Sequence, residues 1–257
     1  MKAASLLTLS LFLLSGFAYA QNSAPTKEDV AKYVQHMMDV QVLFEQSPPT
    51  GMSIEAREIS RTGKSGDDLV VRYQIFVKGV PENTLFKEIE WPVTAEKPAS
   101  PLEGISVGKD GILMCAGTQP NQCGSSEKPN DPIEFITQPR KGEPSRLAFL
   151  APKIELKTVL VPDPIESKDK GCTLHAVRLT SKFELAYISG SGYAPNSDVH
   201  YRAISDTTND LIIRSDDNGT IRFSLIPHTG QKQSGTMRVN ITEPGCSPGL
   251  SYEWGKI

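Results

Sequence analysis

The strongest constraint on the fold of this 257-residue chain is its C-terminal stretch, residues 171–254, where short alternating runs follow one another. Residues 199–203, 221–225 and 237–241 each carry apolar side chains at every second position. Successive side chains of a strand point to opposite faces of a sheet, so this period predicts strands with one buried and one exposed face. Further candidate strands span residues 174–180, 183–189, 211–214 and 250–254. Seven short strands separated by turns predict an immunoglobulin-like sandwich.

The turns of this stretch form a pattern of their own. Residues 190–195 read glycine-x-glycine-aromatic-x-proline, and the Asp217, Asn218, Gly219 hairpin signal precedes a strand with Phe223. Glycine permits positive φ and proline presets a turn. The combination resembles secreted bacterial immunoglobulin-like modules, and it is similar to the IPT/TIG modules and to the neocarzinostatin-like sandwich. The resemblance covers the last third of the chain and implies a sandwich over residues 166–257. Those families bind proteins, sugars or small ligands on different surfaces, so no functional residue is carried over.

The first 20 residues have the composition of a signal peptide. Lys2 precedes an apolar run at residues 4–17, and residues 18–20 match the small-residue cleavage site. The run is shorter than a membrane span of about 20 residues, and Gln21, not cysteine, follows the site. No later apolar stretch is long enough to cross a bilayer. We therefore expect a secreted or periplasmic chain without a transmembrane segment after cleavage.

Charge narrows the classes of partner. The chain has 27 Lys and Arg against 30 Asp and Glu, a net charge of −3. Removal of residues 1–20 takes away Lys2 and no acid, which leaves 26 basic and 30 acidic residues and a net charge of −4. A negative protein is not suited to nucleic acid or to an anionic membrane surface. An envelope or extracellular protein or glycan is the expected partner.

The four cysteines, Cys115, Cys123, Cys172 and Cys246, allow three disulfide pairings. The most economical choice pairs Cys115 with Cys123, around a short loop, and Cys172 with Cys246, at the two ends of the C-terminal module. A reactive or metal-binding thiol site is the alternative in this compartment. The spacing of Cys115 and Cys123 does not match a C-x-x-C redox or zinc motif.

The segment before the sandwiches, residues 21–49, predicts one helix. Thr26 is a candidate N-cap with Asp29 at the capping-box position, apolar residues recur at helical spacing as far as Phe44, and Pro48 and Pro49 end the helix. We expect its apolar stripe to pack on the protein's own sandwich. Docking of the stripe on a partner or a membrane is the alternative.

Residues 50–165 predict a second β-sandwich. Candidate strands span residues 71–77, 85–91, 111–115, 132–137, 146–151 and 153–161. Leu85, Ile89 and Trp91 share one face of the second of these runs. Residues 162–164, Pro-Asp-Pro, are interpreted as a stiff linker. The predicted fold class is therefore mainly β, with two tandem immunoglobulin-like sandwiches behind one N-terminal helix.

Catalytic and metal motifs are not recognisable in the sequence. It contains no G-x-S-x-G, no H-E-x-x-H and no P-loop. His200 alternates with core residues and is expected to face outward. Residues 216–219 lack the spacing of an EF-hand and are interpreted as a turn. We accordingly expect no catalytic residue, no cofactor and no metal.

Two surfaces are candidate binding sites. The first is an outward, mildly basic sheet face, provided that its strands are neighbours, and it would suit an acidic glycan or a carboxylate-bearing partner. Its residues are Arg202, Arg222, Arg238 and Asn240, with Ser224. The alternative is a solvated face whose arginines block edge pairing. The second surface is the group of loops near Cys115 and Cys123, because loops on a rigid scaffold often carry binding function.

These observations favour a non-enzymatic binding protein outside the cytoplasm, with a protein or a carbohydrate as ligand. A hydrolase with a dispersed site is one alternative, which a deep pocket with a perturbed Asp, Glu or His would favour. A structural subunit of an envelope assembly is another, which an exposed apolar helix at residues 26–45 or a large apolar patch would favour.

Overall fold

The computed structural model describes residues 26–64, 68–92, 97–116, 123, 128, 130–180, 184–227 and 232–255. The predicted signal peptide, residues 1–20, lies outside the described residues. The described chain is mainly β, with four antiparallel sheets and one N-terminal helix. Each sheet draws its strands from only one half of the chain, so that the sheets fit two sandwich-like halves.

Helix α1 (Lys27–Phe44) begins where the sequence predicts it. The Thr26 hydroxyl accepts a hydrogen bond from the Asp29 backbone N–H at 3.1 Å, and the Asp29 carboxylate accepts one from the Thr26 N–H at 3.0 Å. This capping box satisfies two donors that the first helical turn would otherwise leave unpaired. No helix in the described part of the chain is long and apolar enough to cross a membrane.

The N-terminal half contains a three-stranded and a five-stranded sheet. The first has the order β1-β2-β6, with β1 (Ser53–Thr62), β2 (Val70–Lys78) and β6 (Phe135–Thr137). The second has the order β5-β4-β3-β7-β8, with β3 (Leu85–Trp91), β4 (Leu102–Val107), β5 (Leu113–Cys115), β7 (Ser145–Ala151) and β8 (Ile154–Leu160). A 3-10 turn, Lys109–Gly111, joins β4 to β5. The core between the sheets includes Val71, Ile75, Phe86 and Phe149.

The C-terminal half contains two four-stranded sheets. One has the order β14-β11-β10-β9, with β9 (Ile165–Asp169), β10 (Cys172–Arg178), β11 (Ala186–Ser191) and β14 (Ile221–Leu225). The other has the order β13-β12-β15-β16, with β12 (Asp198–Ile204), β13 (Thr208–Arg214), β15 (Gly235–Ile241) and β16 (Gly249–Trp254). Their core includes Leu174, Ile188, Val199, Val239 and Trp254.

Both disulfides are the pairs that the sequence analysis predicts as the most economical choice. Cys115 pairs with Cys123, and Cys172 pairs with Cys246. The second bridge lies in the C-terminal core and joins the start of β10 to the segment before β16. It therefore ties the two sheets of that half together across 74 residues of sequence.

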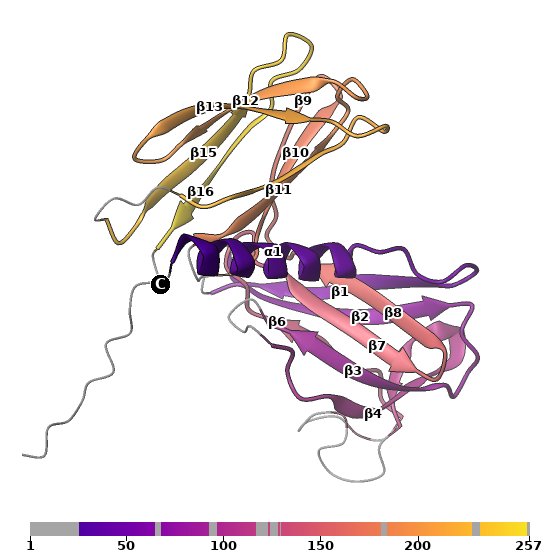
Figure 1. Cartoon of the computed structure of the whole chain (residues 1–257). Helices are drawn as coiled ribbons and strands as arrows, with labels where there is room; N and C mark the ends of the chain where they lie inside the picture. Colours follow the sequence, from indigo (N-terminus) through magenta and orange to yellow (C-terminus); the bar gives the residue numbers. More distant parts are fainter. Residues whose placement is uncertain are drawn as a thin grey trace, which may run out of the picture.

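Helix α1 lies between the two halves (Figure 1). Met37, which is fully buried, packs with Leu179, Leu185 and Tyr187 of the C-terminal half. Val40 and Phe44 pack against the outer face of the five-stranded sheet of the N-terminal half, on Ala148 and the partly buried Ile89, Trp91, Leu150 and Val159. The apolar stripe thus packs within the protein, as expected, but it contacts both halves.

A buried polar group accompanies this contact. The Arg146 guanidinium of β7 is fully buried and donates from Nε to Gln41 Oε1 at 3.0 Å. Gln41 in turn donates to Glu45, and the Tyr187 hydroxyl donates to the same carboxylate at 3.2 Å. The two Nη groups of Arg146 have no hydrogen-bond partner among the described residues. Burial lowers the pKa of Arg146 to about 10.

Three strands were not expected from the sequence: β1, β4 and β9. Most of β1 is exposed, and β9 buries only Ile165, so neither strand has a clear apolar alternation. The turn at residues 216–219 forms as predicted, since the Asp216 carboxylate accepts the N–H groups of Asn218 and Thr220. It is not a hairpin, however, because it joins β13 to β14 in the opposite sheet. A side chain at Gly219, whose φ is +69°, would collide with the Tyr193 carbonyl.

Candidate functional site

A cleft of about 660 Å³ opens at one edge of the N-terminal half, between β6 of the smaller sheet and β3 and β7 of the larger one. We call it the β3–β6 cleft. Its size falls within the range of small-molecule sites in proteins. It is lined by Arg72, Gln74, Glu88, Glu90, Leu102, Cys123, Asp131, Pro132, Ile133, Glu134, Phe135, Ile136, Thr137, Ser145 and Leu147.

The cleft lies at the shortest strand of the smaller sheet. Strand β6 is only three residues long and pairs with Val71, Arg72 and Tyr73 of β2. Strands β3 and β7 of the larger sheet each have seven residues, and side chains of both strands line the opening together with those of β6.

Glu88 is the buried acid of the cleft. It alternates with Phe86 on the inner face of β3 and is cross-strand partner of the core residue Phe149. Its side chain is only 6 % exposed, and no hydrogen bond or ion pair joins it to another described residue. Burial raises the pKa of Glu88 to about 7, and the negative charge of Glu90 adds to this effect.

Thr137 is a second buried polar group without a partner. It is the last residue of β6 and lies opposite Val71 on the inner face of the smaller sheet. Its residue is 9 % exposed, and its hydroxyl makes no hydrogen bond within the described chain. An unpaired buried hydroxyl costs about 1–3 kcal/mol, so both Glu88 and Thr137 would gain from a ligand.

The mouth of the cleft is polar and acidic. Arg72 forms an ion pair with Glu134 at 2.9 Å, and the Ser145 hydroxyl donates to Glu90 at 3.2 Å. Four carboxyl groups, those of Glu88, Glu90, Asp131 and Glu134, line the cleft with one guanidinium, that of Arg72. With every group ionised the formal sum is 1 − 4 = −3.

The apolar wall of the cleft lies beside the acids, because Leu102 is the cross-strand partner of Glu88 and Leu147 is that of Glu90. Leu102, Ile133, Phe135 and Leu147 belong to the core of this half or pack against it, and they also line the cleft. Cys123 lies beside them, bonded to Cys115. The Cys115 N–H donates to the Asp131 carbonyl at 2.9 Å, which anchors the segment that carries Asp131. The cleft is therefore adjacent to the disulfide loop that the sequence singled out, although residues 117–122 of that loop lie outside the described residues.

The predicted basic face is brought together only in part. Arg202 of β12 is opposite Asn240 of β15, and Arg238 is opposite Ile204, so three of the residues share one sheet. Arg222, together with Ser224, lies on β14 in the other sheet of the sandwich, because the chain crosses between sheets at residues 216–219. The four residues therefore do not form one continuous face.

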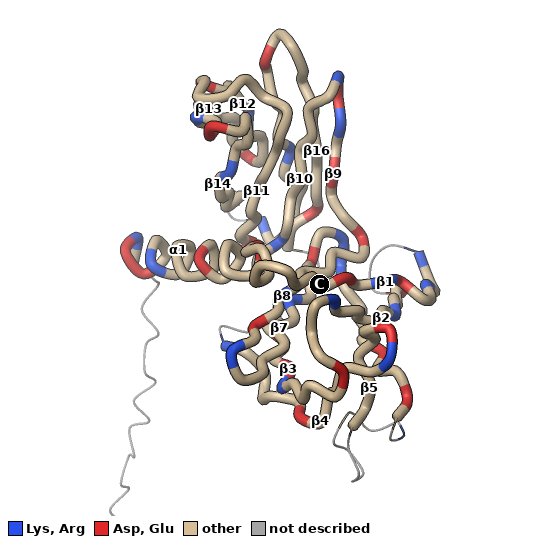
Figure 2. The backbone as a smooth tube through the Cα atoms, turned by 90° about the vertical axis from the view of Figure 1, so that its right-hand side faces the viewer, with Lys and Arg blue, Asp and Glu red and all other residues tan. Residues whose placement is uncertain are grey.

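The arginines of that face are also partly neutralised. Arg202 makes two hydrogen bonds to Asp210, at 2.7 and 3.1 Å, and Arg222 pairs with Asp216 at 2.8 Å. The hydrogen bond that Arg222 donates to Asp216 holds the pKa of Arg222 above its ordinary value. Basic and acidic residues are interspersed over both halves of the protein (Figure 2). We see no basic field at this face.

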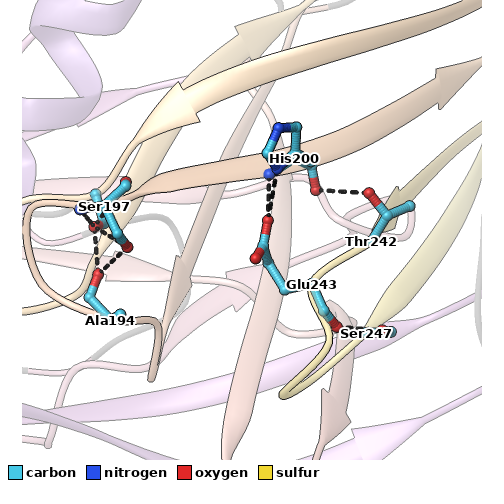
Figure 3. A network of polar contacts seen from close by, with 7 residues as sticks. Ala194, Ser197, His200, Thr242, Glu243 and Ser247 are labelled. Carbon is cyan, nitrogen blue, oxygen red and sulfur yellow. Dashed lines mark hydrogen bonds and ion pairs between the residues drawn. The ribbon is translucent and has the colours of Figure 1, made fainter.

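His200 faces outward, as predicted, and its ring Nδ1 lies 3.1 Å from Glu243 (Figure 3). The same carboxylate accepts the His200 backbone N–H at 2.7 Å. The neighbouring serine hydroxyls donate to backbone carbonyls instead, Ser197 to Ala194 and Ser247 to Glu243. A smaller cavity of about 240 Å³ lies alongside, lined by Tyr193, Val199 and Glu243 among others. These contacts fix loop ends and do not activate a hydroxyl.

Sequence reasoning missed Glu88 for a physical reason. An acid within an alternating strand normally lies on the solvent face, and the alternation predicts one apolar face for Leu85, Ile89 and Trp91. In the structure Ile89 and Trp91 pack under α1 while Leu85 is exposed, and the alternate residues Phe86 and Glu88 face the sandwich interior. The presence of Phe86 two residues before Glu88 is the one sequence signal that could have revealed the second buried face.

The fold and the cleft thus describe a mainly β protein of two sandwich-like halves with an acidic cavity. We compared the sequence with protein-family models and with curated proteins, and neither comparison gives a match.

Proposed function

We propose that this protein is a non-enzymatic binding protein that acts outside the cytoplasm and holds its ligand in the β3–β6 cleft. The observation that supports it best is Glu88: a carboxyl group that is 6 % exposed, lacks a partner within the described chain, and lines a cavity of about 660 Å³. Buried polar groups in proteins normally have partners, so an unpaired one in a cavity indicates a missing ligand group.

The location outside the cytoplasm is part of the proposal. Two disulfides that join all four cysteines are typical of an oxidising compartment. The first 20 residues have the composition of a cleavable signal. We also interpret the halves as immunoglobulin-like sandwiches, whose loops and open edges often carry binding function. A protein or a carbohydrate of the envelope is the ligand class we propose.

The experiment compares cleft and face variants of the oxidised chain 21–257. Binding to a panel of envelope oligosaccharides and peptides is measured by calorimetry for wild type, Glu90→Lys at the mouth, and Arg202→Ala with Arg238→Ala. Glu103→Lys, an exposed acid of the same half paired with Lys87, is the matched control. We expect Glu90→Lys alone to lose binding. Loss in the arginine variant alone would instead place the site on the sheet of β12 and β15.

A hydrolase is the second candidate, because Glu88 also has the property that such an enzyme needs. Its raised pKa is that of a general acid, and Glu90 lies two residues along the same face of β3. We favour binding because two of the three other acids are engaged, Glu90 with Ser145 and Glu134 with Arg72. Release of reducing sugar from a polysaccharide, abolished by Glu88→Gln while binding persists, would decide for the hydrolase.

The structural-subunit alternative receives little support from the helix. Met37, Val40 and Phe44 of α1 are buried against the protein's own halves, although Val42 and Leu43 of the same helix are exposed.

A further inference from the structure

We infer that the β3–β6 cleft binds an aliphatic amine in its protonated form, with the ammonium group beside Glu88 and the carbon chain along the apolar wall. This inference rests on the binding function proposed above and specifies its ligand. It assigns roles to three groups of residues that line one cavity: the buried acceptors Glu88 and Thr137, the acidic mouth, and the wall formed by Leu102, Ile133, Phe135 and Leu147.

The charge of the cleft selects a cation. Its carboxyl groups outnumber its guanidinium by four to one, and Arg72 already pairs with Glu134. A buried carboxylate without a counter-charge is costly, and a cation held next to it removes that cost. An anionic ligand would be repelled by the carboxyl groups, and Arg72, which already pairs with Glu134, is the one cationic side chain among the described residues that line the cleft.

The arrangement suits an organic cation better than a metal ion. No group of three or more His, Cys, Asp or Glu side chains in the described chain is placed to hold a metal. An ammonium group has three N–H donors and needs acceptors only at hydrogen-bond distance. The Glu88 carboxylate and the Thr137 hydroxyl supply such acceptors, and both are more than nine-tenths buried and lack other partners among the described residues.

The apolar wall accounts for the rest of the ligand. Leu102 and Phe135 pack against the core but are only partly buried, so they offer carbon surface to the cleft that they line. Methylene groups placed against these side chains are removed from water, which favours binding. An alkyl chain that ends in an ammonium group can contact an acid and the apolar wall together, because Leu102 is the cross-strand partner of Glu88. That chemistry belongs equally to a free diamine and to the lysine side chain of a partner protein.

Binding should be coupled to a proton. Without a ligand the Glu88 carboxyl is partly protonated near neutral pH, because burial raises its pKa to about 7. Contact with the ammonium group favours the ionised carboxylate. The proton of Glu88 then passes to the buffer, and the amine keeps its own proton. The charged groups around it are Glu90 on β3, Arg72 on β2, and Asp131 and Glu134 on the segment before β6. The cleft residues on β4 and β7, which are Leu102, Ser145 and Leu147, carry no charge.

The test uses calorimetry on the oxidised chain 21–257 with three probes: 1,5-diaminopentane, a short peptide with one lysine, and 1,5-pentanediol as the neutral analogue. We expect an amine probe to bind, the diol not to bind, and binding at pH 5.5 to be roughly 20-fold weaker than at pH 7.5. Protons released on binding are counted from runs in buffers of different ionisation enthalpy. Binding of the diamine alone identifies a free amine as the ligand, and binding of the peptide alone identifies a lysine side chain.

Variants make the assignment specific. Glu88→Gln should abolish both amine binding and proton release, Thr137→Val should weaken binding several-fold, and Glu103→Gln, outside the cleft, should change neither. Melting curves establish that each variant is folded. If neither amine binds, or if Glu88→Gln binds as wild type does, the inference is overturned. A neutral oligosaccharide bound in the cleft under those conditions would leave the binding function standing, whereas no ligand at all in the cleft would remove both.

Discussion

Glu88 combines burial with ionisation at a position that the fold does not need to be acidic. Its neighbours on the inner face of β3 and β7 are Phe86 and Phe149, which build the core. A leucine or a methionine at position 88 would pack there without the cost of burying a carboxyl group. The physical cost of Glu88 to folding is the reason to assign it a functional role, and that cost can be measured.

The first prediction concerns this cost as a function of pH. The pKa of Glu88 rises from an ordinary value of 4.5 to about 7 in the folded protein, so the folded state holds a proton that the unfolded state releases. The contribution of Glu88 to the free energy of unfolding should therefore fall as pH rises from 4.5 to 7. The loss amounts to about 3 kcal/mol above pH 7. Glu88→Gln has no such charge, so its stability relative to wild type should grow over this range.

Urea unfolding at pH 4.5, 6 and 8 measures the difference directly. Glu103→Gln is the control, because Glu103 is exposed and ion-paired with Lys87, and its difference from wild type should lack this rise between pH 4.5 and 7. A constant difference between Glu88→Gln and wild type across the three pH values would show that the carboxyl is not buried as described.

At the scale of elements, the sequence predicted what local patterns determine. The capping box at Thr26, the period of β12 and β15 and both disulfides follow from neighbours in sequence or from simple economy. It could not predict β9, whose polar sequence becomes a strand only because β10 offers an edge to pair with. Nor could it separate Arg222 from Arg202, because strand period does not say to which sheet a strand belongs.

The second prediction belongs to this scale and concerns the disulfides. In the loop-entropy model a bridge across 74 residues is worth about 4 kcal/mol, and one across 8 residues about 2.5 kcal/mol. Thermal melting should therefore show a larger loss for Cys172→Ser than for Cys123→Ser. Double substitutions that replace both cysteines of a bridge, Cys172 with Cys246 or Cys115 with Cys123, leave no unpaired thiol. We expect the same order of stability loss for these double variants. An unchanged melting temperature in the first pair, or the reverse order, would contradict the assignment.

At the scale of the molecule, α1 belongs to both halves. Its residue Met37 completes a cluster of the C-terminal half, while Val40 and Phe44 cover the outer face of the N-terminal five-stranded sheet. The polar chain from Arg146 through Gln41 and Glu45 to Tyr187 crosses the same junction. Either half would expose apolar surface without the helix. We therefore expect the two halves to unfold together rather than as independent domains.

This last prediction can be measured by fluorescence, because the chain has two tryptophans and each half contains one of them. Trp91 lies under α1 in the N-terminal half, and Trp254 lies in the core of the C-terminal half. Fluorescence of Trp91→Phe and Trp254→Phe reports one half each, and the two denaturation midpoints should coincide. Phe44→Ala added to each should cost about 3–5 kcal/mol through lost packing and should separate the midpoints. Val42→Ala, at a position that is 47 % exposed on the same helix, should leave them together. Midpoints that already differ without any helix substitution would mean that α1 does not couple the halves.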